Sequence, residues 1–145
     1  MNAAQLFQVT SLFAGIGWIV ILVISPFWGD FDKFVIGIIF ALLAVVYTWL
    51  NFSNFQPDIL KNFSSLEGVM TLFRNPELVD AAWVHILAFD LLVVVWIKKN
   101  ALSLGIPHAW ILPSLIVSCP FGPLGYLLYL LTRWIRTKNY FSRNF

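Results

Sequence analysis

Long apolar stretches separated by short polar segments run through the chain. Residues 6–28, 34–50, 81–97 and 108–134 are each predominantly apolar. A helix needs about 20 such residues to cross ~30 Å of hydrocarbon, so each stretch has roughly the length of a transmembrane helix. The pattern therefore predicts an all-α polytopic membrane protein in which four transmembrane helices form one domain, residues 1–145.

A cleaved signal peptide is the alternative interpretation of the first stretch. Such a peptide has a basic start, a short apolar region and a cleavage site with small residues. Residues 1–5 contain neither Lys nor Arg. We therefore expect residues 6–28 to be retained as a span.

The segment between the second and third stretches has a helical apolar pattern of its own. The spacing is 4-3-4-3, and the residues that follow it are Ile59, Phe63, Leu66, Met70 and Phe73. Residues 58–74 are therefore predicted to form an amphipathic helix in the membrane interface, with a lid over a cavity as the alternative role. Ser64 and Glu67 have the spacing of a capping box, which places one candidate helix start at Ser64.

Composition supports lipid as the solvent of this chain. Residues are 60% hydrophobic and 11% charged, whereas soluble domains carry about 25% charged residues. A net charge of +2 spread along the chain argues against nucleic acid as a partner, and one cysteine cannot form an internal disulfide.

Basic residues predict the orientation of the four spans. An even number of spans places both termini on one side, and that side would carry Lys61, Arg74, Arg133, Arg136, Lys138 and Arg143. The opposite side would carry Lys33, Lys98 and Lys99. Because cytoplasmic loops are enriched in Lys and Arg, both termini are expected in the cytoplasm.

Asp90 is the first candidate for a functional residue. It lies within the apolar residues 81–97, where the only other ionisable group is His85. A carboxylate at the bilayer centre costs at least ~2.5–3.5 kcal/mol on insertion scales, so its presence indicates a function. Five residues place His85 and Asp90 about 140° apart on a helix, so only a wide cavity could contact both. For His85, a hydrogen bond to a backbone carbonyl is the structural alternative.

The fourth stretch is interrupted by Pro113, Pro120 and Pro123. Each interior proline removes an N–H donor and frees a carbonyl, which lipid cannot satisfy. A polar stripe with helical spacing follows the break: Ser118, Gly122, Tyr126, Tyr129 and Arg133. The coincidence predicts a ligand or ion pocket partway along the span, and a kinked packing helix is the alternative.

Small and polar residues follow one face of the second stretch, at Gly37, Ala41, Ala44, Thr48 and Asn51. Such a face lets helices approach closely, either within one chain or between two copies, so a homo-oligomer is one expectation.

Motifs for phosphate binding, for a serine nucleophile or for a metal cluster are absent from the sequence. The two histidines and one membrane carboxylate are too few for most metal sites. Chemistry, if any, is therefore expected to be acid–base work by Asp90, His85, Tyr126, Tyr129 or Glu77.

Motifs between Leu72 and Arg133 resemble the abscisic-acid-deficient-four-like (ABA4-like) family. They are Leu72-Phe73-x-x-Pro76, Trp83-Val84-His85-x-Leu87-Ala88-Phe89-Asp90-Leu91, Trp96-Ile97, Gly105-Ile106-Pro107-His108, Pro113 and Phe121-Gly122-Pro123-x-Gly125-x-Leu127-Leu128-Tyr129. The family comprises small four-helix membrane proteins, and its plant members sit in plastids and are needed to make neoxanthin from violaxanthin.

The resemblance implies a carotenoid or related isoprenoid ligand and a cofactor-free isomerisation of an epoxide to an allene. Asp90 and His85 are the predicted catalytic residues, and the predicted ligand-binding residues are Trp83, His108, Ser118, Gly122, Tyr126 and Tyr129. The short form indicates a bacterial member in the inner membrane, surrounded by lipid. The alternative function is a non-catalytic membrane subunit or one protomer of a small oligomeric transporter.

Overall fold

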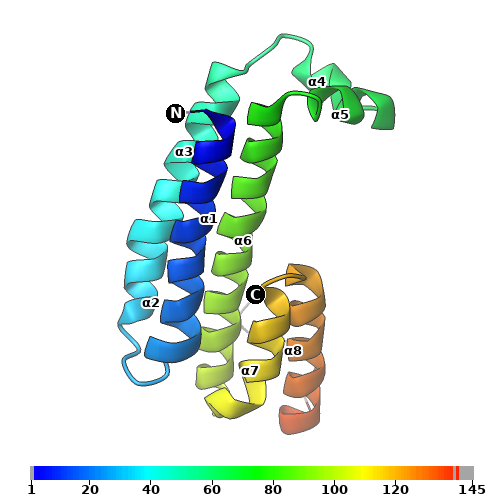
Figure 1. Ribbon diagram of the computed structural model, residues 1–145. Coiled ribbons are helices and arrows are strands. Elements are labelled where there is room, and N and C mark those ends of the chain that lie inside the picture. Colours follow the sequence, from blue (N-terminus) through cyan, green and yellow to red (C-terminus); the bar gives the residue numbers. More distant parts are fainter. Residues whose placement is uncertain (1, 139, 141–145) are drawn as a thin grey trace.

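The regular elements of the protein are all helical in the part of the chain that a computed structural model describes, residues 2–138 and 140. Three long segments stand side by side (Figure 1). They are α1 (Ala3–Ile19) with the π-helical turn η1 (Val20–Ile24); α2 (Phe31–Phe34) with η2 (Val35–Phe40) and α3 (Ala41–Ser53); and α6 (Pro76–Ser103).

These three segments are 22, 23 and 28 residues long and apolar enough to cross a membrane. The second and third segments contain the predicted spans 34–50 and 81–97, whereas the first ends at Ile24, before the end of the predicted span 6–28. α6 is longer than expected at both ends, so that Asp80 and Lys98 belong to the helix. The protein is therefore a helical membrane protein by the length and composition of these segments.

The fourth predicted span, residues 108–134, is not one helix. It is a hairpin of α7 (His108–Ser118) and α8 (Gly122–Thr137), and the two helices run back to back (Figure 1). Pro120 has no N–H to continue α7, and Phe121 has φ −138° and ψ 68°, outside the helical region, so the chain reverses there. Of the three prolines expected to interrupt one helix, Pro113 lies in the interior of α7, Pro120 lies between the two helices, and Pro123 lies in the first turn of α8.

The hairpin changes the predicted topology. α1 begins at one end of α6, and α8 ends at the other end (Figure 1). As far as Thr137, the chain therefore starts and ends at opposite ends of α6, which differs from the arrangement expected of four spans; residues 141–145 lie outside the described part. Three long segments followed by a hairpin, whose two ends both lie near the end of α6, produce this arrangement.

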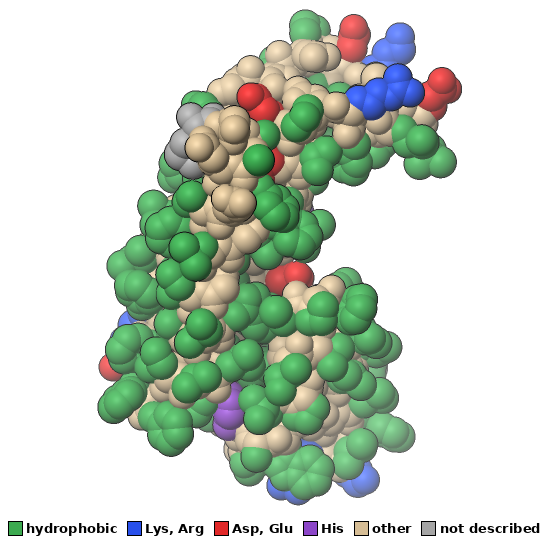
Figure 2. Space-filling model, viewed as in Figure 1, with side chains coloured by type: hydrophobic (Ala, Val, Ile, Leu, Met, Phe, Trp, Pro, Cys, Tyr) green, Lys and Arg blue, Asp and Glu red, His purple; other side chains and the backbone are tan. Residues whose placement is uncertain are grey.

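Helix α6 is the centre of the packing, because α1, α3, α7 and α8 all lie against it. Its residues Val84, Leu91, Val94 and Ile97 are fully buried. A Cβ atom on Gly17 of α1 would lie 3.0 Å from Leu91, so the glycine permits close approach of α1 and α6. Hydrophobic side chains are spread over the face of the bundle shown in Figure 2, and many large hydrophobic residues of the three long segments are exposed.

The predicted amphipathic helix at residues 58–74 is two short helices, α4 (Ile59–Asn62) and α5 (Leu66–Leu72). They project sideways from the end of the bundle where α1 begins (Figure 1). Ser65, and not Ser64, is the N-cap of α5: its backbone is extended, and its hydroxyl accepts a hydrogen bond from Gly68 N at 3.1 Å. The Ser64 hydroxyl instead donates to Lys61 O, which excludes it from the cap.

Candidate functional site

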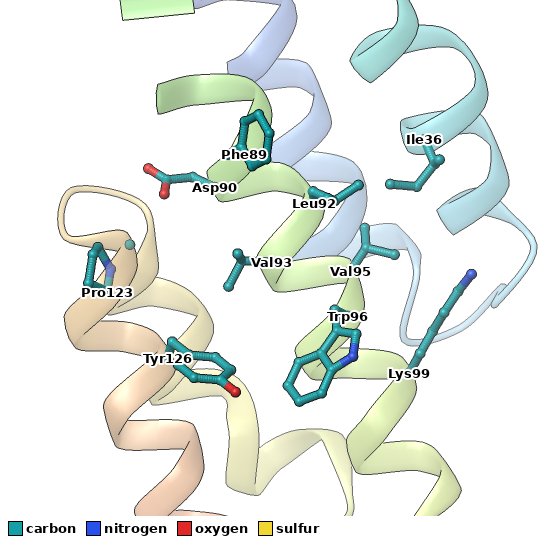
Figure 3. A pocket seen from close by; sticks show the side chains of 11 residues that line it. Ile36, Phe89, Asp90, Leu92, Val93, Val95, Trp96, Lys99, Pro123 and Tyr126 are labelled. Atoms are coloured by element: carbon teal, nitrogen blue, oxygen red, sulfur yellow. The ribbon is translucent and has the colours of Figure 1, made fainter. Parts of the chain in front are cut away.

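An open groove of about 740 Å³ runs between α6, α8 and η2. Its floor is α6, and its walls come from α8 on one side and η2 on the other (Figure 3). The residues that line it are Ile36, Phe89, Asp90, Leu92, Val93, Val95, Trp96, Lys99, Gly122, Pro123 and Tyr126. The lining is largely apolar, as expected of a site for an apolar ligand with few polar groups.

Asp90 lies where the tip of the hairpin meets α6. A Cβ atom on Gly122 would lie 2.0 Å from Asp90 Oδ1, so only glycine leaves room for the carboxyl group. Gly122 is the first residue of α8, and Phe121 before it provides no side-chain cap. A carboxylate at a helix N-terminus is stabilised by the free N–H groups and the helix dipole. The hairpin therefore gives Asp90 a favourable position without giving it a counter-ion.

Tyr126 and Trp96 form the aromatic part of the groove. Their ring centroids are 5.6 Å apart. Tyr129 lies one turn further along α8, buried and edge-on to Trp96 at 5.9 Å. Its hydroxyl donates to Asn100 Oδ1 at 2.5 Å. Tyr126 thus lines the groove, whereas Tyr129 packs against Trp96 and does not line the groove.

His85 lies in a different cavity from Asp90. This second cavity has a volume of about 190 Å³ beneath α4 and α5, and its polar lining residues are Tyr47, Asn51 and His85. The imidazole packs on Phe89 at 4.6 Å and on Tyr47 at 5.4 Å between ring centroids. The predicted separation of His85 and Asp90 around the helix is what keeps the two side chains apart.

Besides Tyr129, three predicted ligand-binding residues lie outside both cavities. Trp83 is on the side of α6 that faces α1, where its Nε1 donates to Ser11 Oγ at 2.9 Å. Ser118 is buried inside the hairpin and donates to Ser114 O at 2.8 Å. His108 begins α7, and its Nε2 atom is buried without a hydrogen-bond partner in the described part of the chain. Trp83 thus links α6 to α1, whereas the hydrogen bond of Ser118 stays within α7.

A buried ion pair at the base of the bundle was missed by sequence reasoning. Lys98 Nζ lies 2.9 Å from Asp32 Oδ1 and 3.1 Å from Asp32 Oδ2, and it also donates to Ser25 O at 2.9 Å. Ser25 Oγ donates to Asp32 Oδ1 at 2.5 Å. Lys98 was interpreted as the polar end of a span. The available signal was that the turn before Lys33 and the end of the third span were expected on the same side of the membrane.

Few side chains in the groove can take part in acid–base chemistry. Its ionisable groups are Asp90, Tyr126 and Lys99. In Figure 3, Asp90 points toward the hairpin and Lys99 toward η2, so the two charges lie on opposite sides of the groove. Within residues 2–138 and 140, no group of three or more His, Cys, Asp or Glu side chains could hold a metal ion. The arrangement suits proton transfer to or from an apolar ligand.

Comparison with known proteins points to one family. A family model described as ABA DEFICIENT 4-like matches residues 5–129. The chain is also similar to the protein ABA DEFICIENT 4, chloroplastic, of Arabidopsis thaliana, with 25% identity over 96 residues. That match covers 61% of this chain but only 44% of the length of the plant protein. No solved structure matches.

Proposed function

Because this chain belongs to the ABA DEFICIENT 4-like family, we propose that it binds a carotenoid or a related long isoprenoid beside Asp90 and isomerises an epoxide of that ligand to an allene. The observation that carries the proposal is the open groove with a carboxyl group at one edge. A volume of about 740 Å³ lies within the ~300–1,000 Å³ range of ligand sites.

The groove lining suits a long unsaturated chain. Phe89, Trp96 and Tyr126 offer aromatic surfaces, and Leu92 and Val93 complete an apolar floor. The groove is open along one side, so a ligand dissolved in the bilayer enters laterally without passing through water. Apolar contact area supplies the affinity, and Asp90 is the polar group that selects and orients the ligand.

Asp90 alone can complete the isomerisation. In its protonated form the carboxyl group gives a proton to the epoxide oxygen, and the adjacent C–O bond breaks to leave a hydroxyl group. The resulting carboxylate then removes the vinylic proton next to the cationic carbon, and that C–H electron pair forms the second double bond of the allene. The carboxyl group ends protonated again, so atoms and electrons balance without a cofactor. General acid–base help is worth ~10²–10⁴-fold per group.

The test is Asp90→Asn in protein supplied with violaxanthin in lipid nanodiscs, with the allenic product measured by chromatography. We expect the wild type to form product and the variant to lose at least about 10²-fold in rate while it retains the pigment. Asp30→Asn, in an exposed turn, is the matched control and should keep full activity. Equal rates for the Asp90 variant and the wild type would contradict the proposed mechanism. Absence of bound pigment in all variants would contradict the proposed ligand class.

We also propose an orientation for the bundle that differs from the expectation above. With the hairpin in place, Arg133, Arg136 and Lys138 join Lys33, Lys98 and Lys99 at one end of α6, and the other end retains Lys61 and Arg74. The positive-inside rule then places the base of the hairpin in the cytoplasm and the start of α1 on the opposite side, where α4 and α5 lie in the interface. A cysteine introduced at the exposed Leu66 should label from outside the cell and one at Ser103 from the cytoplasm, whereas the reverse result would restore the orientation expected from four spans.

A second candidate function is a non-catalytic subunit or a protomer of an oligomeric transporter. The observation that favours it is that Gly37 and Ala41 are exposed, and a Cβ atom on Gly37 would meet nothing within 4 Å. A face of small residues that packs against no helix of its own chain suits a second copy. Ala41→Leu should dissociate the oligomer if this candidate is right, and should leave the mass in mild detergent unchanged if the protein works as a monomer.

A further inference from the structure

One face of α6 joins the groove to the cavity that contains His85. Residues at spacings of three and four follow this face, and they are Leu78, Ala82, His85, Phe89, Val93 and Trp96. The first three line the His85 cavity and the last three line the groove. Side chains at this spacing form one stripe along a helix. The two cavities are therefore successive parts of one track, with Phe89 between them.

We propose that the His85 cavity holds the hydroxylated end group of the same ligand whose chain occupies the groove. This inference rests on the proposed function and adds to it the part of the ligand that is recognised. The track from Leu78 to Trp96 covers eighteen residues, or ~27 Å of helix axis. That length approaches the ~30 Å hydrocarbon thickness of a bilayer, so the occupant is a long molecule lying along α6.

The size of the His85 cavity suits one end of a ligand. A volume of about 190 Å³ is below the usual ~300–1,000 Å³ of a complete ligand site. The segments of α4 and α5 contribute Ile59, Phe63, Leu72 and Phe73 to its lining, and His85 lies at its exposed side, so an end group inserted there contacts apolar side chains and remains open to the membrane interface.

The chemistry of this cavity suits a hydroxyl group. In the described part of the chain, no hydrogen bond or ion pair reaches the His85 imidazole, which packs only on the rings of Tyr47 and Phe89. Asn51 uses its Nδ2 on Tyr47 O at 2.8 Å and leaves its carbonyl oxygen available. A hydroxyl group can donate to one of these acceptors and accept from His85 or Tyr47.

The position of His85 also determines which part of the ligand meets Asp90. Five residues separate the two side chains along α6, a rise of ~7.5 Å. With the end group held at His85, the ligand atoms beside Asp90 are at least about 8 Å from that end group, because the two side chains also lie about 140° apart around the helix. The position of the end group therefore sets which bonds of the chain lie beside the carboxyl group.

Two probes that differ only at their end groups test the inference. Zeaxanthin and β-carotene share one polyene, but zeaxanthin carries a hydroxyl group on each end ring. Binding to the protein in nanodiscs is followed by quenching of tryptophan fluorescence, because Trp96 lies in the groove. We expect His85→Phe to weaken zeaxanthin binding about three- to tenfold, the value of one hydrogen bond, and to leave β-carotene binding within about twofold. Phenylalanine keeps the ring contacts with Tyr47 and Phe89.

Two further variants distinguish an effect on the cavity from an effect on folding. Thr48→Val, the matched control, removes an exposed hydroxyl group next to Tyr47 that donates to Ala44 O, and should bind both probes normally. Ala82→Phe fills the cavity and should weaken both probes. If both probes bind the wild type and His85→Phe weakens neither, or weakens both equally, the inference is overturned while the proposed ligand class stands. If neither probe binds the wild type, the proposed ligand class itself fails.

Discussion

Two carboxyl groups within the membrane helices of this protein have opposite surroundings. Asp32 is 3% exposed and receives hydrogen bonds from Lys98 and Ser25. Asp90 is half-buried, borders a groove of about 740 Å³, and has no side-chain hydrogen bond among the described residues. One carboxyl group is satisfied within the chain, and the other faces an open space.

The contrast separates a structural role from a functional one. Breaking a buried pair leaves an uncompensated charge in a medium that solvates it poorly, so Asp32 and Lys98 hold α2, α6 and η1 together. Asp90 has neither a side-chain hydrogen bond nor a counter-ion among the described residues, so its oxygens are available to a ligand. A membrane carboxyl group by itself therefore does not identify a site. The distinguishing feature is whether the fold has already satisfied the group.

The largest effect is expected at the paired carboxylate. Lys98→Met leaves Asp32 buried without its counter-ion and should lower the free energy of unfolding by about 3–5 kcal/mol. Lys99→Met, at the exposed neighbouring position, should change it by no more than about 0.5 kcal/mol. Denaturant titration followed by circular dichroism measures both. Equal stability of the two variants would show that the ion pair is not what holds the base of the bundle.

At the open carboxyl group, a change in geometry should affect function more than stability. A Cβ atom at Gly122 collides with Asp90 Oδ1, so Gly122→Ala should displace the carboxyl group and lower the isomerisation rate about 10²-fold. Gly15→Ala, where a Cβ atom meets nothing within 4 Å, is the control and should keep the wild-type rate. An unaffected rate in Gly122→Ala would mean that Asp90 need not stay at the hairpin tip.

A smaller effect tests the hairpin that brings Gly122 to Asp90. A Cβ atom on Gly125 would lie 2.5 Å from Ser118 N and 2.6 Å from Ser114 O, so Gly125→Ala should destabilise the protein by about 1–3 kcal/mol through overpacking. In a single straight helix, positions 118 and 125 would be ~10.5 Å apart and could not collide. Thermal unfolding of Gly125→Ala beside Gly37→Ala decides between the two arrangements, and equal midpoints would favour the straight span.

The smallest effect is expected at Trp83, which belongs to neither region. Trp83→Phe removes one hydrogen bond to Ser11 and keeps a ring against Phe7, so a loss of about 0.5–1.5 kcal/mol in stability is expected. Because Trp83 lines neither cavity, carotenoid binding should not change. A fall in carotenoid affinity with unchanged stability would show that Trp83 contacts the ligand.

Local properties of the sequence determined much of this protein. The first three spans follow from length and hydropathy, because each residue contributes its own free energy of transfer from water to lipid, largely independent of distant residues. Asp90 could be selected for the same reason. The angle between His85 and Asp90 followed from helix geometry alone, and their separate cavities agree with it.

Only the tertiary structure decided how the C-terminal region folds and which polar groups are paired. The prolines after Val117 permit either a kink or a reversal, and the reversal depends on close packing of Gly125 against Ser118, which no local rule contains. Asp32 and Lys98 are 66 residues apart, so their pairing depends on how α2 and α6 meet. Local sequence determines which segments can enter the membrane, because solvation is local. Contacts between distant segments determine which buried groups remain available to a ligand.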